Sequence, residues 1–227
     1  MTARVGVRPA DWELAGRIRV RSTGCAQGDL GGGGPAVDSR RRAVVDLPWT
    51  VLNQVHGARV VVVEGPGGAT GEAADAAVAT SSGTALAVLT ADCAPVALAS
   101  PEGVLGVAHA GWKGLRAGVV EATVTTMRRL GATRVEAVLG PCIHPCCYAF
   151  GAEELGRVES RLGTQVRSFD RHGAPALNLP AGVRAALHAS GAVLVGDAGI
   201  CTGCSASYWS WRGSGCDRRQ ATVVWRP

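Results

Sequence analysis

The stretch TALAVLTADCAPVALASPEGVLGVAHAG, residues 84–111, decides the predicted fold. Its apolar runs at 94–99 and 104–108 are typical of buried strands, and a Ser-Pro-Glu-Gly turn joins them. Strands joined by so short a turn form a hairpin. Cys93 directly precedes the first strand and His109 directly follows the second, so the hairpin brings both side chains to one edge of a sheet.

The sequence on both sides of this hairpin alternates between apolar strand-like runs and amphipathic segments that end near Gly or Pro. Expected strands lie at 18–20, 49–55, 59–63, 84–90, 135–139, 193–195 and 221–225. Expected helices lie at 38–45, 114–130, 153–162 and 180–189, and a Gly-rich loop lies at 31–34. No internal repeat or linker divides the chain, so we expect a single α+β domain with mixed sheets over residues 1–227.

Length and composition fit this expectation. The chain has 227 residues, of which 47% are hydrophobic, enough for one large domain with a substantial core. Its net charge of +5 is carried almost wholly by arginine, and Lys113 is the only lysine. The arginines are scattered rather than gathered into a basic stripe with interleaved aromatic residues. We therefore predict no nucleic-acid partner, whereas anionic small molecules are compatible with this charge.

The sequence predicts neither export nor a membrane span. Met1 to Trp12 lacks the apolar core of a signal peptide, and no window reaches the roughly 18 uncharged apolar residues of a membrane helix. We expect a cytoplasmic protein without a membrane partner. In that compartment its eight cysteines are expected to serve as ligands, nucleophiles or buried thiols rather than as disulfides.

His56 adds a third metal-binding side chain to the two residues at the hairpin edge. It lies in Asn-Gln-Val-His-Gly, in the turn between two expected strands. Two imidazoles and one thiolate, from His56, His109 and Cys93, make a three-ligand zinc site whose fourth position is open to water or substrate. Asp92 would orient a ligand or move protons beside Cys93. The alternative is that all of these are ordinary core side chains at strand ends.

Five other cysteines have no role fixed by the sequence. Cys201-Thr-Gly-Cys204 has Cys-x-x-Cys spacing but no second such pair, which favours ordinary buried thiols. A second metal site is an alternative for the group Cys142, His144, Cys146 and Cys147. Since adjacent cysteines point in different directions in an extended segment, we interpret this group as part of a wall.

Separated motifs in this chain resemble the signature of a known family. The motifs are Gln54-Val-His56-Gly, Thr90-Ala-Asp-Cys93-Ala-Pro, His109-Ala-Gly-Trp-Lys-Gly, Gly140-Pro-Cys-Ile and Ser210-Trp-Arg212. They resemble the laccase-domain family, also called multicopper polyphenol oxidase-like proteins or peptidoglycan editing factors. The resemblance runs from about Trp49 to residue 227.

The resemblance implies a four-layer α/β/β/α fold related to the catalytic domain of cytotoxic necrotizing factor. It implies zinc held by His56, Cys93 and His109, with copper as the less favoured metal. It further implies action on purine nucleosides, namely phosphorolysis of adenosine, inosine, guanosine and methylthioadenosine, and deamination of adenosine. The small-molecule partners implied are therefore purine nucleosides and phosphate.

Two parts of the chain depart from the family pattern. In the divergent segment 1–48, Thr23 is followed by Gly24 and Cys25, where the family has an arginine before a Gly-Gly pair. Asp38-Ser39-Arg40 stands in place of the family's Glu-Asn-Arg, and Ala149 replaces a glutamate that commonly follows the tyrosine. These departures concern substrate and phosphate recognition rather than the metal site.

The implied reactions assign tasks to particular residues. The expected catalytic residues are Asp92, Cys93 and His109. Deamination needs a water activated at C6 of adenine, which is the chemistry of an open zinc position, and Asp92 is the nearest group to move its proton. Phosphorolysis needs phosphate near the anomeric carbon and stabilisation of the departing purine. The cations considered for that work are Arg40, Lys113, Arg116 and Arg212.

Two other reaction classes use the same residues. Cys93 as a thiolate paired with His109 would form an acyl-enzyme on an amide, as in editing of peptidoglycan precursors. Copper-dependent polyphenol oxidation ranks third, because five histidines in total are few for several copper ions. A non-catalytic scaffold is favoured only if the strand-end residues lie far apart. Metal content separates the zinc enzyme from the cysteine amidase.

Overall fold

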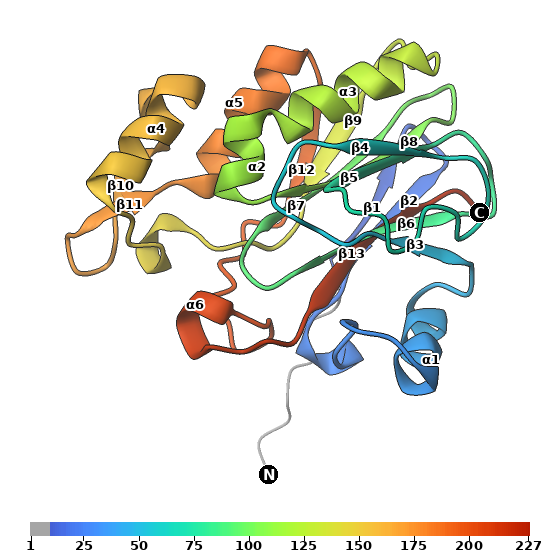
Figure 1. Ribbon diagram of the computed structural model, residues 1–227, viewed down its shortest axis with the longest axis horizontal. Helices are drawn as coiled ribbons and strands as arrows, with labels where there is room; N and C mark the ends of the chain where they lie inside the picture. Colours follow the sequence, from blue (N-terminus) through green and yellow to red (C-terminus); the bar gives the residue numbers. More distant parts are fainter. Residues whose placement is uncertain (1–9) are drawn as a thin grey trace.

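The structure is a computed structural model that describes residues 10–227. Most of the segment from Met1 to Trp12, on which the prediction of no signal peptide rests, lies outside the described residues. Two large sheets, the helices around them and a small two-stranded sheet make up the described part of the molecule (Figure 1). Over residues 10–227, the helices are all too short or too polar to traverse a bilayer.

The first sheet has five strands in the order β1, β2, β13, β6, β3. These strands span Ala10–Leu14, Ile18–Ser22, Gln220–Trp225, Ala85–Thr90 and Trp49–Val51, respectively. Strand β3 runs parallel to β6, and the other pairs are antiparallel. The sheet is therefore mixed, and its central strand β13 comes from the far end of the sequence.

The second sheet has six strands in the order β12, β9, β7, β8, β5, β4. They span Val193–Asp197, Glu136–Leu139, Ala94–Ala99, Leu105–Ala110, Ala76–Ala79 and Val60–Val63, respectively. Strands β7 and β8 form the predicted antiparallel hairpin, in which Pro95 pairs with His109. This register confirms that Cys93 and His109 lie at the same end of the two strands.

Helices cover the outer faces of both sheets (Figure 1). The six-stranded sheet carries α2, α3, α4 and α5, which span Trp112–Ala117, Val119–Arg129, Ala152–Leu162 and Leu179–Ser190. The five-stranded sheet carries α1, Pro35–Val44. The short helix α6, Trp211–Ser214, and the small sheet of β10, Arg167–Phe169, and β11, Pro175–Leu177, lie outside these layers. The expected mixed α+β domain is confirmed, with layers in the order α/β/β/α.

Alternating side chains on the central strands divide the core between these layers. Val96 and Leu98 of β7 pack under the helices, whereas Ala97 and Ala99 of the same strand face the other sheet. Successive strand residues point to opposite faces, so a strand covered on both sides is apolar throughout. The unbroken apolar runs of the sequence thus mark the strands at the centre of the sandwich.

Two sequence-based boundaries were wrong for local reasons. The helix expected at 114–130 is two helices, because Gly118 adopts the left-handed region at φ +87° and ends α2 before α3 begins. The strand expected at 49–55 ends at Val51. Beyond it the side chain of Gln54, rather than the backbone, bonds to β6 through the N–H and C=O of Leu89.

Most of the other expected elements are present within a few residues of their predicted limits. The helix expected at 38–45 begins earlier, at Pro35, because proline fits the first turn of a helix. Strands β1, β5, β10 and β11 were not predicted. The sequence of β5 is Ala-Ala-Val-Ala, which has little strand propensity of its own and is held by its neighbours β4 and β8.

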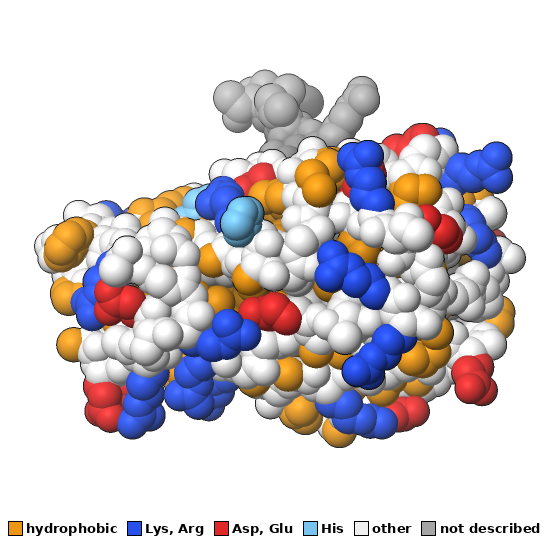
Figure 2. All heavy atoms as spheres, turned by 90° about the horizontal axis from the view of Figure 1, so that it is seen from above, with side chains coloured by type: hydrophobic (Ala, Val, Ile, Leu, Met, Phe, Trp, Pro, Cys, Tyr) orange, Lys and Arg blue, Asp and Glu red, His pale blue; other side chains and the backbone are white. Residues whose placement is uncertain are grey.

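Figure 2 shows the molecule from the side of the helices that cover the six-stranded sheet. On this face Lys and Arg side chains are spread among acidic and hydrophobic ones, without a continuous basic stripe. This distribution agrees with the scattered charge of the sequence. The absence of a nucleic-acid partner remains a prediction.

Candidate metal centre and substrate pocket

His56, Cys93 and His109 meet at one end of the central strands β7 and β8 of the six-stranded sheet. Their ligand atoms all lie within 4.8 Å of one another, and Cys93 Sγ is 3.8 Å from Nε2 of His56. The two imidazole rings meet edge to face, with centroids 4.8 Å apart. Imidazole nitrogens and a thiolate are the donors that zinc prefers, so this donor set fits a metal ion with three protein ligands.

Asp75, directly before β5, is the buried centre of this arrangement. Its carboxylate accepts a hydrogen bond from Nδ1 of His109 at 2.8 Å. This bond directs Nε2 of the same ring toward the site. The same carboxylate accepts the backbone N–H groups of Val55, His56 and Gly57 at 3.2, 2.8 and 2.6 Å. One side chain therefore orients His109 and holds the loop that carries His56, as outer partners of metal ligands do.

Sequence reasoning missed Asp75. The signal was present, because a lone carboxylate interrupts the apolar run Ala-Ala-Asp-Ala-Ala at 73–77. A buried charge in such a run requires compensating hydrogen bonds, which here come from the metal-ligand candidates.

The protonation of Cys93 and His109 is coupled. Burial opposes ionisation of Cys93, but hydrogen bonds and charge from His109 and His56 outweigh it and lower the pKa of the thiol to about 6. Burial likewise opposes the charged form of His109, but Asp75 and Cys93 raise the pKa of its imidazole to about 9. The metal-free site therefore holds a thiolate beside an imidazolium at neutral pH. A metal ion would replace the imidazolium proton.

Backbone geometry explains the motif residues around the ligands. His56 has φ +60° and Asp92 has φ +97°, two uncommon left-handed conformations beside the site. Gln54 fixes the His56 loop to β6 through its paired hydrogen bonds of 2.7 and 2.8 Å to Leu89. At Gly111 a Cβ atom would lie 2.9 Å from Cys93 Sγ and 3.1 Å from His56 Cδ2. Glycine follows the His109 strand because the ligands occupy that space.

Asp92 fastens a distant segment of the chain to the site. Its Oδ1 accepts the hydroxyls of Thr202 and Ser210 at 2.6 and 2.7 Å, and its Oδ2 accepts the backbone N–H of Arg212 at 2.6 Å. Asp92 is 7% exposed and contributes to the wall of the pocket. Its role as a proton shuttle stays a prediction, while its contacts show that it positions α6.

The three ligand candidates open into a pocket of about 710 Å³. Trp211, which is 58% exposed, and Tyr148 contribute aromatic surface to it, and Arg212 and Arg219 contribute positive charge. The pocket therefore offers apolar rings, cations and a metal-ligand cluster in one space, the combination that a small polar aromatic ligand needs.

Of the four cations considered for binding phosphate, the structure places one in the pocket. Arg212 lines the pocket, with its guanidinium 5.0 Å from the Tyr148 ring centre. Lys113 and Arg116 lie on the exposed side of α2 over the Trp112 ring, and neither lines this pocket.

Arg40, on α1, donates to the carbonyl of Asp29 at 3.0 Å and does not line the pocket either. Arg219 does line it and was missed by the sequence reasoning. Its position in the charged turn Asp217-Arg-Arg219 just before a strand was the available signal.

Comparisons with known proteins agree with this architecture. A purine nucleoside phosphorylase of Streptomyces griseus is 44% identical over 180 residues, covering 77% of this chain and 72% of that protein. A purine nucleoside phosphorylase of Streptomyces coelicolor is 42% identical over 178 residues, covering 77% of this chain and 73% of that protein. A crystal structure of a Neisseria meningitidis protein has a TM-score of 0.82 at 26% identity, covering 97% of this chain and 99% of that one.

A family model adds the extent of the relationship. The model described as multi-copper polyphenol oxidoreductase laccase matches residues 36–227, so the match starts on α1, ahead of Trp49, where the sequence motifs begin. The matched range holds the His56, Cys93 and His109 cluster and nearly all of both sheets' shared core. This chain therefore belongs to the multi-copper polyphenol oxidoreductase laccase family.

Proposed function

We propose that this protein is a zinc-dependent, cytoplasmic purine nucleoside phosphorylase that cleaves adenosine, inosine, guanosine and methylthioadenosine, and that the same pocket deaminates adenosine. The observation that carries the proposal is the opening of the His56, Cys93 and His109 cluster into a pocket with aromatic and cationic walls. Two relatives that are more than 40% identical bear the name purine nucleoside phosphorylase.

His56 Nε2, Cys93 Sγ and His109 Nε2 are the atoms that would hold the zinc. When bound, zinc supplies an electrophilic centre that polarises an oxygen placed at its open position. Asp75 keeps His109 in the tautomer that presents Nε2. It also keeps the strained His56 loop in place, so the ligand geometry exists before any ligand arrives.

In phosphorolysis a phosphate oxygen bonds to the anomeric carbon, the carbon–nitrogen bond breaks, and the purine leaves with the bonding electron pair and takes up a proton. Arg212 and Arg219 are the pocket cations suited to hold the phosphate, since a guanidinium binds two phosphate oxygens at once. The exposed ring of Trp211 is suited to stack on the purine. Deamination is a different attack, in which water adds to C6 of the purine and ammonia leaves, so the nucleoside must then lie with C6 rather than the anomeric carbon at the activated water.

Paired variants test the assignment of the cations. Arg212→Ala is expected to raise the KM for phosphate at least tenfold. Arg116→Ala removes a cation that lies on α2 and outside the pocket, so it should change this KM little. Equal effects of the two substitutions on phosphate KM would disprove the assignment.

A cysteine-dependent amidase is the second candidate, because one observation favours it. Asp75, His109 and Cys93 form a chain of acid, imidazole and thiol, and the metal-free thiol has a pKa of about 6. A peptidoglycan precursor carrying an incorrect amino acid is the substrate class considered for such an enzyme.

Metal analysis combined with assays separates the two candidates. Wild-type protein and the His56→Ala variant are purified without added metal and incubated with adenosine and phosphate, and products are separated by chromatography. His188→Ala, an exposed histidine on α5, is the matched control. We expect the wild type and the control to form adenine or inosine and to hold one zinc ion more than His56→Ala, which should form neither product. A wild type that holds no more zinc than His56→Ala and turns over no nucleoside would place the amidase first.

A further inference from the structure

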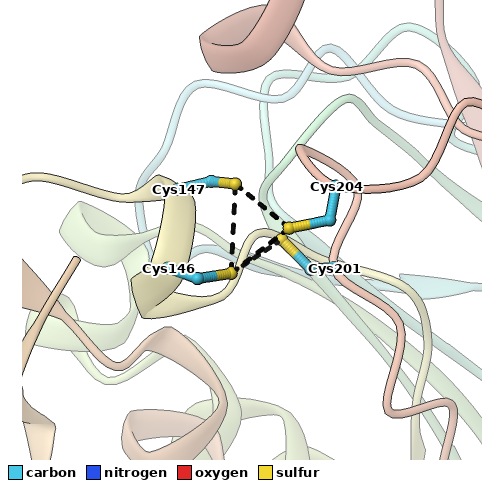
Figure 3. Close-up of side chains that lie close together, drawn as sticks. All are labelled: Cys146, Cys147, Cys201 and Cys204. Carbon is cyan, nitrogen blue, oxygen red and sulfur yellow. Dashed lines mark hydrogen bonds between the residues drawn. The ribbon is translucent and has the colours of Figure 1, made fainter. Parts of the chain in front are cut away.

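Four cysteines form a second cluster, separate from the three ligand candidates described above. Cys146, Cys147, Cys201 and Cys204 point toward one another, and their sulfur atoms all lie within 4.8 Å (Figure 3). All four are free thiols. Two come from the loop that follows β9 and two from the loop that follows β12, so the cluster joins segments more than fifty residues apart.

The local backbone explains how adjacent cysteines serve one site. Pro145–Cys147 forms a 3-10 helix rather than an extended segment, and the tight turn brings both side chains to one side. The sequence-based view that Cys146 and Cys147 point in different directions was therefore wrong. Cys201 and Cys204 approach each other because the N–H of Cys204 donates to the carbonyl of Cys201 at 3.2 Å.

The sulfur–sulfur distances match those around a single zinc ion. A tetrahedral site with zinc–sulfur bonds of about 2.3 Å has edges of about 3.8 Å between sulfur atoms. The measured separations are 3.9 Å for Cys146 and Cys147, 3.6 Å for Cys146 and Cys201, 3.4 Å for Cys146 and Cys204, and 3.3 Å for Cys147 and Cys204. A small contraction or expansion of the side chains would bring all four sulfurs to a shared metal.

The groups around the cluster suit a negatively charged site. Arg171 donates to Cys147 and lies 3.6 Å from the sulfur of Cys204. The backbone N–H of His144 donates to the sulfur of Cys201 at 3.4 Å. Four thiolates around a divalent ion carry a net charge of −2, which a guanidinium and an N–H donor stabilise. Gly203 leaves room for this packing, since a Cβ there would lie 2.8 Å from Cys147 Cβ.

We propose that Cys146, Cys147, Cys201 and Cys204 bind a structural zinc ion as a closed site with four thiolate ligands. A closed site has no position for substrate, so its task is to clamp the two loops together. The clamp bears directly on the substrate pocket. Tyr148, which lines the pocket, follows Cys147, and Thr202, which bonds to Asp92, follows Cys201. The proposal goes beyond the proposed function and does not depend on it.

Zinc content of the full-length protein tests the proposal. The wild type is expected to hold two zinc ions per chain, His56→Ala one, and Cys204→Ser one. Cys216→Ser is the matched control, because this half-buried cysteine lies outside the cluster, and it is expected to keep both ions. The Cys204→Ser protein should also unfold at a lower temperature than the control.

The ligand type is read from cobalt reconstitution. His56→Ala protein loaded with Co²⁺ is expected to show the intense sulfur-to-cobalt charge-transfer absorption of a thiolate site, and His56→Ala/Cys204→Ser should not. A His56→Ala protein that holds no zinc and also fails to bind Co²⁺ would overturn the proposal. This outcome does not depend on whether a cysteine variant folds. Disulfides within the cluster of the freshly purified wild type would overturn it as well. A wild-type protein that binds zinc at the four cysteines but turns over no nucleoside would instead count against the proposed function and leave this proposal standing.

Discussion

Asp75 and His109 are joined by a hydrogen bond of 2.8 Å between carboxylate and imidazole, and both side chains are at least 96% buried. Asp75 directly precedes β5 and His109 lies on the neighbouring strand β8, so the pairing of these strands sets their separation. The backbone repeats the link, because the N–H of His109 donates to the carbonyl of Asp75 at 2.7 Å. A ligand supported in this way keeps its orientation with or without metal.

Removing the charge of Asp75 is expected to weaken the metal site. In Asp75→Asn the amide cannot accept all the bonds that the carboxylate accepts, and the His109 tautomer is no longer fixed. Zinc affinity should fall about 10- to 100-fold, as for other outer partners of metal ligands. Competition with a chromophoric chelator measures this. Glu72→Gln, an exposed carboxylate paired with Arg59, is the control and should bind zinc like the wild type.

Cys93 should react as a thiolate in the metal-free protein at neutral pH. Its pKa of about 6 means that the alkylation rate by iodoacetamide rises through that pH and levels off above it. The alkylation rate of an ordinary thiol, with a pKa near 9.0, would still increase with pH above pH 6. Peptide mapping of chelator-treated protein gives the rate for each cysteine. A midpoint for Cys93 above pH 8 would contradict the proposed thiolate and imidazolium pair.

The same pair makes stability depend on pH in two opposite directions. The raised pKa of His109 stabilises the fold fully below its ordinary value of 6.5, and this stabilisation is lost as pH rises through about 9. The lowered pKa of Cys93 stabilises the fold fully above its ordinary value of 9.0, and this is lost as pH falls through about 6. One contribution is therefore lost over nearly the same pH range in which the other is gained, so the free energy of unfolding of the metal-free protein, measured by chemical unfolding, should change little between about pH 6.5 and 9. Cys93→Ser keeps only the His109 contribution and should lose stability as pH rises through that range.

A single methyl group at Gly111 is expected to destroy the metal site. Its Cβ would lie 2.9 Å from Cys93 Sγ and 3.1 Å from His56 Cδ2, so two of the three ligand side chains would have to shift. Gly111→Ala should therefore lose the zinc ion of this site and nucleoside turnover. The control is Gly156→Ala in α4, where nothing lies within 4 Å and the added methyl should stabilise the helix by about 0.5–1 kcal/mol. Full zinc content in Gly111→Ala would show that the ligands tolerate displacement.

Trp211→Ala is expected to raise the KM for nucleosides by about tenfold to a hundredfold, because stacking of a base on an aromatic ring contributes about 1–3 kcal/mol. Since the ring is 58% exposed, the fold should be little affected. Trp211→Phe should recover most of the affinity. Phe169→Ala removes another exposed ring, 69% exposed on β10, and should leave the KM unchanged. Initial rates over a range of adenosine concentrations separate KM from kcat.

Asp92→Asn distinguishes proton transfer from positioning. If Asp92 holds α6 in place through Ser210 and Arg212, the variant should show a higher KM for phosphate and an unchanged shape of the pH–rate profile. Loss of one limb of the profile for adenosine deamination, with KM unaltered, would instead identify Asp92 as the proton shuttle.

The sequence predicted what depends on short stretches of chain. Cys93 and His109 were placed together because one hairpin with a short turn fixes their register. Asp75 was missed because the strand that follows it, β5, is an alanine-rich segment that becomes a strand only through its neighbours. Tertiary pairing of this kind leaves no periodic signal in the sequence.

The pocket and the cysteine cluster also depend on tertiary contacts that the sequence alone does not reveal. Arg219 and Trp211 reach the pocket because their segments cross from the second sheet to the first, which no local pattern encodes. The two cysteine pairs were seen separately: Cys201 and Cys204 were interpreted as ordinary buried thiols, and Cys146 and Cys147 as part of a wall. The 3-10 turn at Pro145–Cys147 and the hydrogen bond within 201–204 bring them together.

The central place of β13 in the five-stranded sheet governs the order in which the chain is able to fold during synthesis. Strands β2 and β6 meet only through β13, so both keep an unpaired edge until residues 220–225 have left the ribosome. Asp92 likewise gains its hydrogen bonds from Ser210 and Arg212 only after those residues have been synthesised. A nascent chain stalled before this strand exposes two apolar strand edges that invite pairing with other chains, and it is a natural client for a chaperone.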